Sequence, residues 1–210
     1  MRSTTRAPWR RAFVTWGGAA ALGLGVALTA TAEDAPAVGL PFEEQVQVCG
    51  ACHGNDGNSQ QAGTPSLAGQ PELTIVNQMI YFRERLRQNE VMTPQARGLP
   101  DVEIQALAAY YHEQPVAAPE GEPDPELKAR GQEVASQQRC ASCHLSDYRG
   151  REQMPRLAGQ REDYLVAAMV AYRDRTRGGP DTTMIDVMRG IDDDDIDAMA
   201  HFFTYLHVEE

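Results

Sequence analysis

Aromatic residues, cysteines and long hydrophobic runs are all scarce in this sequence of 210 residues. Aromatic residues make up 7% of the chain, which is little for a self-sufficient core, so a large buried apolar group would compensate. After residue 32 no stretch is long and apolar enough to cross a bilayer. No segment alternates apolar and polar residues convincingly, as a half-buried strand would. These absences exclude a polytopic membrane protein and an all-β fold.

Basic residues are also few once the N-terminus is set aside. The first eleven residues carry four arginines and no acid, and the apolar stretch that follows ends in Ala30-Thr31-Ala32, a typical cleavage pattern. We therefore expect a signal peptide over residues 1–32 and an exported, periplasmic chain; a twin-arginine signal and an uncleaved anchor are alternatives. Because the segment holds four arginines and no acid, its removal changes the formal charge from −11 to −15. Such a chain should favour basic partners and should not bind nucleic acid.

An internal repeat with an offset of 90–92 residues organises the rest of the chain. The segment Cys49–His53 recurs as Cys140–His144, and Pro65–Gln70 recurs as Pro155–Gln160. Arginines and methionines follow in the same order: Arg83, Arg85 and Arg87 match Arg173, Arg175 and Arg177, Met79 matches Met169, and Met92 matches Met184. The conserved order indicates a tandem duplication of a domain of about 85 residues.

A proline-rich segment separates the two copies. Residues 114–125 hold four prolines and a glycine, which rules out a helix and favours a semi-rigid linker. We therefore expect an N-terminal domain over residues 33–118 and a C-terminal domain over residues 119–210. Apolar residues recur with the helical period, so the predicted fold is all-α. Helices are expected over residues 41–48, 72–87, 100–113, 125–139, 162–175 and 192–207.

Each copy begins with Cys-x-x-Cys-His, the attachment signature of c-type haem. Two thiols three residues apart can form thioethers with both vinyl groups on one porphyrin edge, and the next residue places its imidazole under the iron. We therefore predict two covalent haem c groups, held by Cys49, Cys52 and His53 and by Cys140, Cys143 and His144. Two local disulfides or one four-cysteine zinc site are the alternatives, but neither explains the histidine after each second cysteine.

Each iron then needs a ligand opposite its histidine. The other histidines, at positions 112, 201 and 207, do not match between the copies, so bis-histidine ligation is not expected. Met92 and Met184 do match, and we predict them as iron ligands in loops beyond the central helix. Met79 and Met169 are expected in the helical core, and Met154 and Met188 have no counterpart. A six-coordinate iron leaves no open position for a substrate, which favours electron transfer over catalysis.

Other repeated residues are candidates for supporting roles. A carbonyl at Pro65 or Pro155 can accept the imidazole N–H of the haem histidine, although a plain turn proline is the alternative. The repeated arginines either stabilise helix ends or neutralise haem propionates. The acidic run at residues 192–195 is interpreted as the start of a helix rather than as a metal site.

The whole set of repeated residues resembles the cytochrome c4 family of di-haem periplasmic cytochromes over essentially all of the mature chain. The resemblance rests on the two Cys-x-x-Cys-His motifs, the two Pro-x-Leu-Ala-Gly-Gln segments and the methionines Met92 and Met184. It implies two class I cytochrome c domains related by a pseudo-twofold axis, with haems close enough for internal electron transfer. In that family a glycine typically stands two residues before the last arginine of each triplet, where this chain has Arg85 and Arg175.

We accordingly expect a monomeric electron carrier that is not an enzyme. The resemblance implies that it works between a quinol-oxidising complex and a terminal oxidase, with at most loose association with a membrane. The alternative is the di-haem electron-accepting subunit of a flavoprotein sulfide dehydrogenase. A di-haem enzyme that acts at iron would need an open sixth position or a cysteine ligand, and no spare cysteine exists.

Overall fold

Helices supply the regular structure in residues 39–206, the part of the chain that the computed structural model describes. The expected signal peptide and His207 lie outside these residues. The first repeat contains α1 (Phe42–His53), α2 (Glu72–Arg83), α3 (Met92–Ala96) and α4 (Asp101–His112). The second contains α5 (Pro125–Gln137), α6 (Ala141–His144), α7 (Glu162–Arg173), α8 (Thr183–Val187) and α9 (Asp193–Thr204). Between residues 39 and 206 the only strand-like pairing is an isolated bridge from Arg151 to Met154, so the all-α prediction is confirmed.

The two central helices end earlier than the hydrophobic pattern predicts. We expected helices to residues 87 and 175, but α2 stops at Arg83 and α7 at Arg173. The cause is a left-handed backbone at Arg85 (φ 59°) and Arg175 (φ 58°), which cannot continue a right-handed helix. The family glycine named above would adopt this conformation without strain.

The prediction that Met92 and Met184 lie in loops is wrong. Met92 begins α3, and Met184 is the second residue of α8. A side-chain oxygen before each helix accounts for the helical turn: Asn89 Oδ1 accepts from Met92 N at 2.8 Å, and Asp181 Oδ1 accepts from Thr183 N at 2.8 Å. These bonds satisfy backbone donors that the first turn of a helix leaves free.

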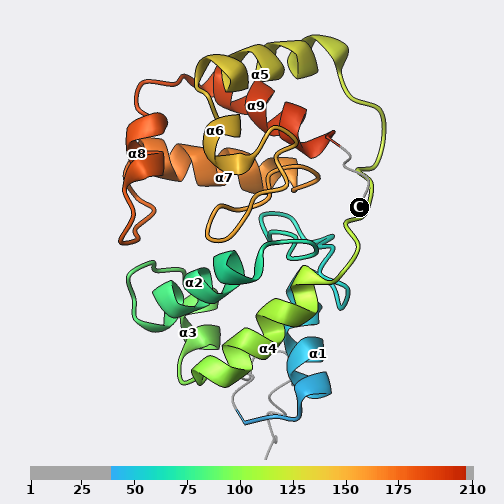
Figure 1. Cartoon of the computed structure of the whole chain (residues 1–210), viewed down its shortest axis with the longest axis vertical. Helices are drawn as coiled ribbons and strands as arrows, with labels where there is room; N and C mark the ends of the chain where they lie inside the picture. Colours follow the sequence, from blue (N-terminus) through green and yellow to red (C-terminus); the bar gives the residue numbers. More distant parts are fainter. Residues whose placement is uncertain (1–38, 207–210) are drawn as a thin grey trace, which may run out of the picture. The chain divides into compact units, whose positions relative to one another are not determined.

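Each repeat packs its helices around its own hydrophobic core. In the first repeat α2 packs on α4, and Ile75, Leu107 and Tyr111 are buried between them. In the second repeat α9 packs on α5 and α7, and its Ile196, Met199 and Phe203 are nearly inaccessible. Figure 1 shows α1–α4 and α5–α9 as two groups of helices joined by an extended segment between α4 and α5.

The linker is extended, as its prolines predict, and side chains of both repeats bind it. Asn58 of the first repeat donates to the Pro115 carbonyl at 3.0 Å and accepts from Ala117 N at 2.9 Å. At the other end, Tyr205 donates its hydroxyl proton to the Glu120 carbonyl at 3.1 Å. The linker therefore lies along the protein instead of crossing free solvent.

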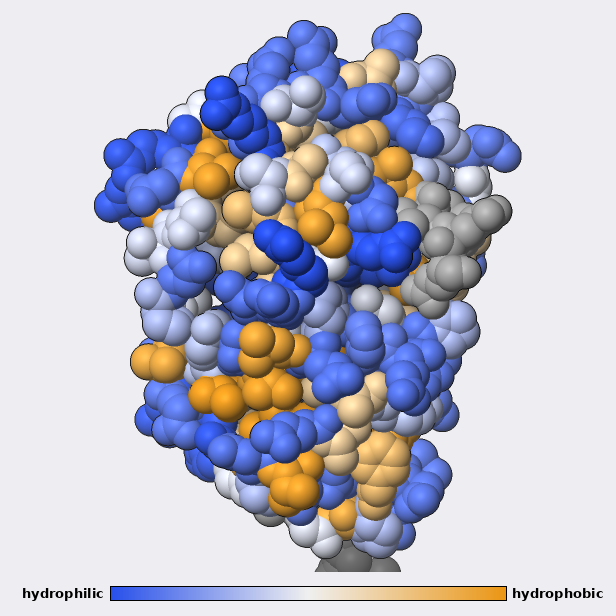
Figure 2. Space-filling view, in the orientation of Figure 1, coloured by the Kyte–Doolittle hydropathy of each residue, from blue (hydrophilic) through white to orange (hydrophobic). Residues whose placement is uncertain are grey.

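Large exposed hydrophobic side chains are concentrated in the first repeat. Among the described residues they are Phe42, Leu73, Leu86, Val91 and Val102 in the first repeat and Leu127 in the second. Figure 2 shows apolar surface over the first repeat within a mostly hydrophilic exterior. No helix within residues 39–206 combines the length and hydrophobicity that a membrane span requires.

Candidate functional site

Each histidine of the repeated motif is buried and is held by a proline carbonyl. His53 is 6% exposed and His144 4%. The Nδ1 atom of His53 lies 2.8 Å from the Pro65 carbonyl, and that of His144 lies 2.8 Å from the Pro155 carbonyl. Because a carbonyl can only accept, Nδ1 carries the proton and Nε2 keeps its lone pair for a metal. Burial lowers the pKa of both imidazoles, which also favours the neutral, ligating form.

The paired cysteines are free thiols that lie three residues apart. In the first repeat α1 continues through Cys49 and Cys52, so both thiols lie on one face of the helix. In the second repeat the left-handed Arg139 (φ 57°) follows α5, and Cys140 immediately precedes the separate helix α6, which begins at Ala141. Burial raises the pKa of Cys49 to about 11, so its thiol is neutral and packed among apolar groups.

The two alternatives to haem find no support in this geometry. All four cysteines are unpaired, and no cluster of three or more potential ligands that could hold a metal occurs within residues 39–206. A four-cysteine zinc site would require such a cluster. The acidic run at residues 192–195 starts α9 as expected, since Asp192 accepts from Asp195 N at 2.9 Å.

The methionines selected from the sequence differ in their surroundings. Met184 packs against the same hydrophobic cluster as Cys140, together with buried Met169 and Met188. In the first repeat it is Met79 that packs against the cluster of Cys49, and Met92 is half-buried at the start of α3. The sequence prediction of Met92 and Met184 as ligands therefore stays a prediction.

The remaining histidines in the described range hold the fold together. His112 donates from Nδ1 to the Gln70 carbonyl at 2.9 Å, and its counterpart Thr204 donates to the Gln160 carbonyl at 2.8 Å. His201 uses both ring nitrogens, because Nε2 accepts from Asp124 N at 2.9 Å and Nδ1 lies 3.2 Å from Glu162. Neither histidine needs a metal to satisfy its polar atoms.

The first arginine of each triplet has the helix-end role that the sequence suggested. Arg83 ends α2 and donates to the Leu99 carbonyl and to Asp101, at 2.8 and 2.7 Å. Arg173 ends α7 and pairs with Asp174 and Asp193. These side chains are satisfied by carboxylates of their own repeat.

The last arginine of each triplet lies in a different environment, in a cluster shared by the two repeats. Arg87 covers the Phe82 ring and donates to Gln78 at 2.5 Å. Arg177 covers a tyrosine ring of its own repeat and donates to Gln78 at 3.5 Å and to the hydroxyl of Tyr164 at 3.3 Å. Sequence reasoning assigned no role to Gln78 or Tyr164, because neither is part of the matched repeat.

The cluster carries two positive charges without an acidic partner. No carboxylate within residues 39–206 forms an ion pair with Arg87 or Arg177. Burial raises the pKa of Tyr164, but the charges of Arg177 and Arg87 outweigh this effect and lower it to about 8. Arg87 and Arg177 are therefore two partly desolvated cations in one cluster, and a nearby anion would stabilise them.

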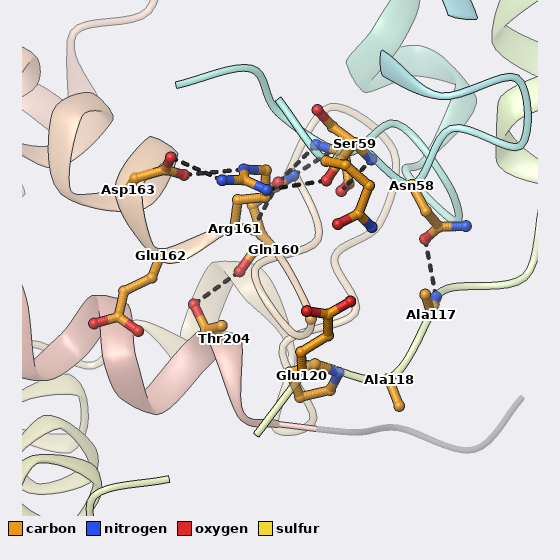
Figure 3. Close-up of a pocket in the computed structure, with 14 residues that line it drawn as sticks. Asn58, Ser59, Ala117, Ala118, Glu120, Gln160, Arg161, Glu162, Asp163 and Thr204 are labelled. Carbon is orange, nitrogen blue, oxygen red and sulfur yellow. Dashed lines mark hydrogen bonds and ion pairs between the residues drawn. The ribbon is translucent and has the colours of Figure 1, made fainter. Parts of the chain in front are cut away.

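A polar pocket of about 330 Å³ also lies between the repeats (Figure 3). Figure 3 shows Arg161 bound to Asp163, Gln160 beside Thr204, and Asn58 against Ala117. None of the predicted iron ligands lines this pocket.

The residues present fit a covalent haem in each repeat. Two free thiols precede a buried imidazole whose Nδ1 is fixed by a proline carbonyl, and this arrangement is present in both repeats. The helical fold and these duplicated sites define a di-haem c-type cytochrome. Residues 43–110 match the family model of cytochrome c oxidase, cbb3-type, subunit III, and residues 128–206 match that of cytochrome c.

The chain belongs to the cytochrome c4 family. It is 35% identical over 186 residues to cytochrome c4 of Thiocapsa roseopersicina. The matched region covers 82% of this chain and 95% of the relative. The crystal structure of reduced recombinant cytochrome c4 from Pseudomonas stutzeri matches 79% of this chain and 97% of its own, with a TM-score of 0.73 and 28% identity. The protein thus carries two covalent haem c groups and functions in electron transfer.

The chain is also similar to an electron acceptor of a dehydrogenase. The thiosulfate dehydrogenase electron acceptor of Thiomonas intermedia strain K12 is 34% identical over 155 residues, which cover 69% of this chain and 71% of that protein.

Proposed function

We propose that the protein is an exported, periplasmic electron carrier whose two irons each have one histidine and one methionine ligand. His53 and Met92 would hold the first iron, and His144 and Met184 the second. The observation that carries the proposal is the duplicated bond from each buried histidine to a proline carbonyl, at 2.8 Å in both repeats. A bound haem supplies reversible one-electron chemistry, while these residues fix the imidazole and favour its neutral form.

The proposed partners are a quinol-oxidising complex as donor and a terminal oxidase as acceptor. The support is the family membership together with an acidic chain of formal charge −11, which favours docking on basic surfaces. In this proposal the protein is a monomer, converts no substrate of its own and associates at most loosely with the membrane. The signal peptide over residues 1–32, and domains over residues 33–118 and 119–210, belong to the same proposal.

A second candidate is an electron acceptor for a dehydrogenase of sulfur compounds. The sequence suggested a flavoprotein sulfide dehydrogenase, and similarity to the thiosulfate dehydrogenase electron acceptor favours this class of partner. Reduction of the purified protein by quinol-oxidising membranes, compared with reduction by thiosulfate or sulfide dehydrogenase, distinguishes the two candidates. Faster reduction by a sulfur dehydrogenase would overturn the first proposal.

We propose that the cluster of Arg87, Arg177 and Tyr164 binds haem propionates. Arg87 and Arg177 lack acidic partners within residues 39–206, and a propionate would supply the missing negative charge. Replacement of Arg177 by Gln should lower the potential of at least one haem, since loss of a nearby positive charge favours the ferric form. An unchanged pair of potentials would contradict this assignment.

The ligand proposal is tested by haem content and by absorption. A pyridine haemochrome assay should find two haems per chain, and the ferric protein should show the weak near-infrared band of methionine bound to iron. Met92→Ala and Met184→Ala should each remove about half of that band. Met79→Leu is the matched control, because Met79 lies in the first-repeat core and its loss should leave the band intact. Full retention of the band in both Ala variants would exclude these ligands.

A further inference from the structure

Two buried glutamines, one in each repeat, bind the backbone of the opposite repeat. Gln160 accepts from Ser66 N at 2.8 Å through Oε1 and donates to the Ser66 carbonyl at 2.8 Å through Nε2. Gln70 accepts from Arg156 N at 3.0 Å and donates to the Arg156 carbonyl at 2.9 Å. The two repeats belong to one unit, Thr31–Glu210, and these four bonds are reciprocal contacts between equivalent positions.

Both glutamines are buried, and a hydrogen bond to its backbone carbonyl holds each one in place. Gln70 is 7% exposed and Gln160 is 4% exposed, so neither amide exchanges freely with water. The backbone carbonyl of Gln70 accepts from His112, and that of Gln160 accepts from Thr204, at equivalent positions of α4 and α9. Loss of either side-chain amide would remove two hydrogen bonds between the repeats at a site with little access to water.

The peptide that each glutamine binds is the one that holds a haem histidine. Ser66 follows Pro65, so the Pro65 carbonyl and the Ser66 N–H belong to a single peptide group. Its oxygen accepts from His53 Nδ1 at 2.8 Å, while its N–H donates to Gln160 of the other repeat. The same arrangement joins His144, the peptide between Pro155 and Arg156, and Gln70.

A hydrogen bond at one end of a peptide group affects the bond at the other end. When the N–H donates, the carbonyl of the same group becomes more negative and accepts more strongly, an effect of roughly 10–30% per bond. A stronger acceptor at Nδ1 makes the imidazole more basic at Nε2 and stabilises ferric iron. Each glutamine is therefore connected to the imidazole of the opposite repeat through one peptide group.

We propose that Gln70 and Gln160 are positioning residues that act across the repeat interface, each tuning the haem of the other repeat. Gln160 sets the hydrogen bond of His53, and Gln70 sets that of His144. This inference rests on the proposed role of the two histidines as iron ligands. It gives the interface a function beyond holding two haems together, since a change in one repeat alters the electron affinity of the other.

The test uses the haem-loaded protein and replaces each glutamine in two ways. Gln160→Met keeps the approximate shape but removes both bonds to Ser66, together with the bond that Oε1 accepts from Arg161 N at 2.9 Å. The His53 bond therefore weakens and the potential of the first haem rises. Gln160→Glu keeps the length and offers a stronger acceptor to Ser66 N–H, so the same potential falls. We expect a change of about two- to fivefold in the oxidised-to-reduced ratio at a fixed applied potential. Gln70→Met and Gln70→Glu should do the same to the second haem.

The two haems are distinguished by their spectra. In a Cys52→Ala background the first haem keeps one free vinyl group, and its reduced α-band moves to longer wavelength. Spectroelectrochemical titration then follows each haem separately. The control is Thr74→Val, which removes another bond between the repeats, from Thr74 Oγ1 to the Glu152 carbonyl at 3.0 Å, without touching either proline peptide.

The expected result is a shift confined to the haem of the opposite repeat, with opposite signs for Met and Glu. A shift in the same repeat, equal shifts in both haems, or shifts no larger than those of Thr74→Val would overturn the inference. The Glu variants, which retain an acceptor and the side-chain length, provide the measurement if the Met variants do not fold. If the glutamine inference fails while the unsubstituted protein has two haems per chain and an intact near-infrared band, the ligand proposal still holds. If the unsubstituted protein lacks either the two haems or the band, the ligand proposal itself is refuted.

Discussion

The contact between α5 and α9 leaves no room for a side chain at Gly131 in the second repeat. A Cβ atom built at Gly131 would lie 2.0 Å from the carbonyl oxygen of Ala198, 2.5 Å from its carbonyl carbon and 2.7 Å from Cβ of Phe202. Ordinary contacts of such an atom begin at 3.4 Å. The nearest obstacle is backbone, so the helices must separate before any side chain fits.

The size of the effect follows from two opposing contributions. Overpacking of a core costs about 1–3 kcal/mol, and the upper end applies because a main-chain carbonyl cannot rotate away. Alanine gains about 1 kcal/mol over glycine in a helix interior. Gly131→Ala should therefore destabilise the second repeat by about 2 kcal/mol, which corresponds to a fall in melting temperature of roughly 8–16 °C for a domain of this size.

Thermal unfolding of the haem-loaded protein, followed by far-ultraviolet circular dichroism, measures this difference. Gln132→Ala is the control, since Gln132 is the next residue of α5 and is exposed. Its effect should stay within about 0.5 kcal/mol. If Gly131→Ala melts at the wild-type temperature or above it, the close approach of α5 and α9 is refuted.

Three further predictions concern other positions. Arg175→Gly should stabilise the protein by about 0.5–1 kcal/mol in thermal unfolding, because it relieves a left-handed arginine, and a destabilised variant would contradict this. A hydrogen bond from Arg161 holds the pKa of Asp163 below its usual value. The Asp163 carboxylate, which also accepts from Gly63 N, therefore contributes stability at neutral pH that is lost as pH falls through this lowered pKa. Acid unfolding of Asp163→Asn should accordingly be less steep below about pH 4. His112→Thr, which introduces the residue of the second repeat, should preserve both haem potentials, and a shifted potential would show that His112 does more than bind Gln70.

The hydrophobic pattern predicted where helices begin better than where they end. Local chemistry explains the starts, as at Asp124, whose side chain accepts from Glu126 N and Leu127 N at the first turn of α5. The ends of α2 and α7 depend on left-handed arginines, a conformation that the residue type argues against. Sequence periodicity therefore placed these ends two to four residues too late.

The arginine triplets illustrate what a repeat can and cannot reveal. Matching positions identified the arginines as a set but left helix stabilisation and propionate binding as equal interpretations. Tertiary packing gives the arginines different surroundings, because Arg83 binds Asp101 within its own repeat and Arg87 binds Gln78 beside Arg177. That difference depends on residues outside the repeated pattern.

The sequence by itself determined that two copies of one helical unit each carry a haem attachment motif, because covalent chemistry requires both thiols and the imidazole within five consecutive residues. It also singled out Pro65 and Pro155, whose spacing from the histidines is repeated. Only the tertiary structure decided what the glutamines of Pro-x-Leu-Ala-Gly-Gln do, since their partners lie 86 and 94 residues away in the other repeat. Bonds over such separations leave no local pattern, and they form only when two folded repeats bury their amides against each other.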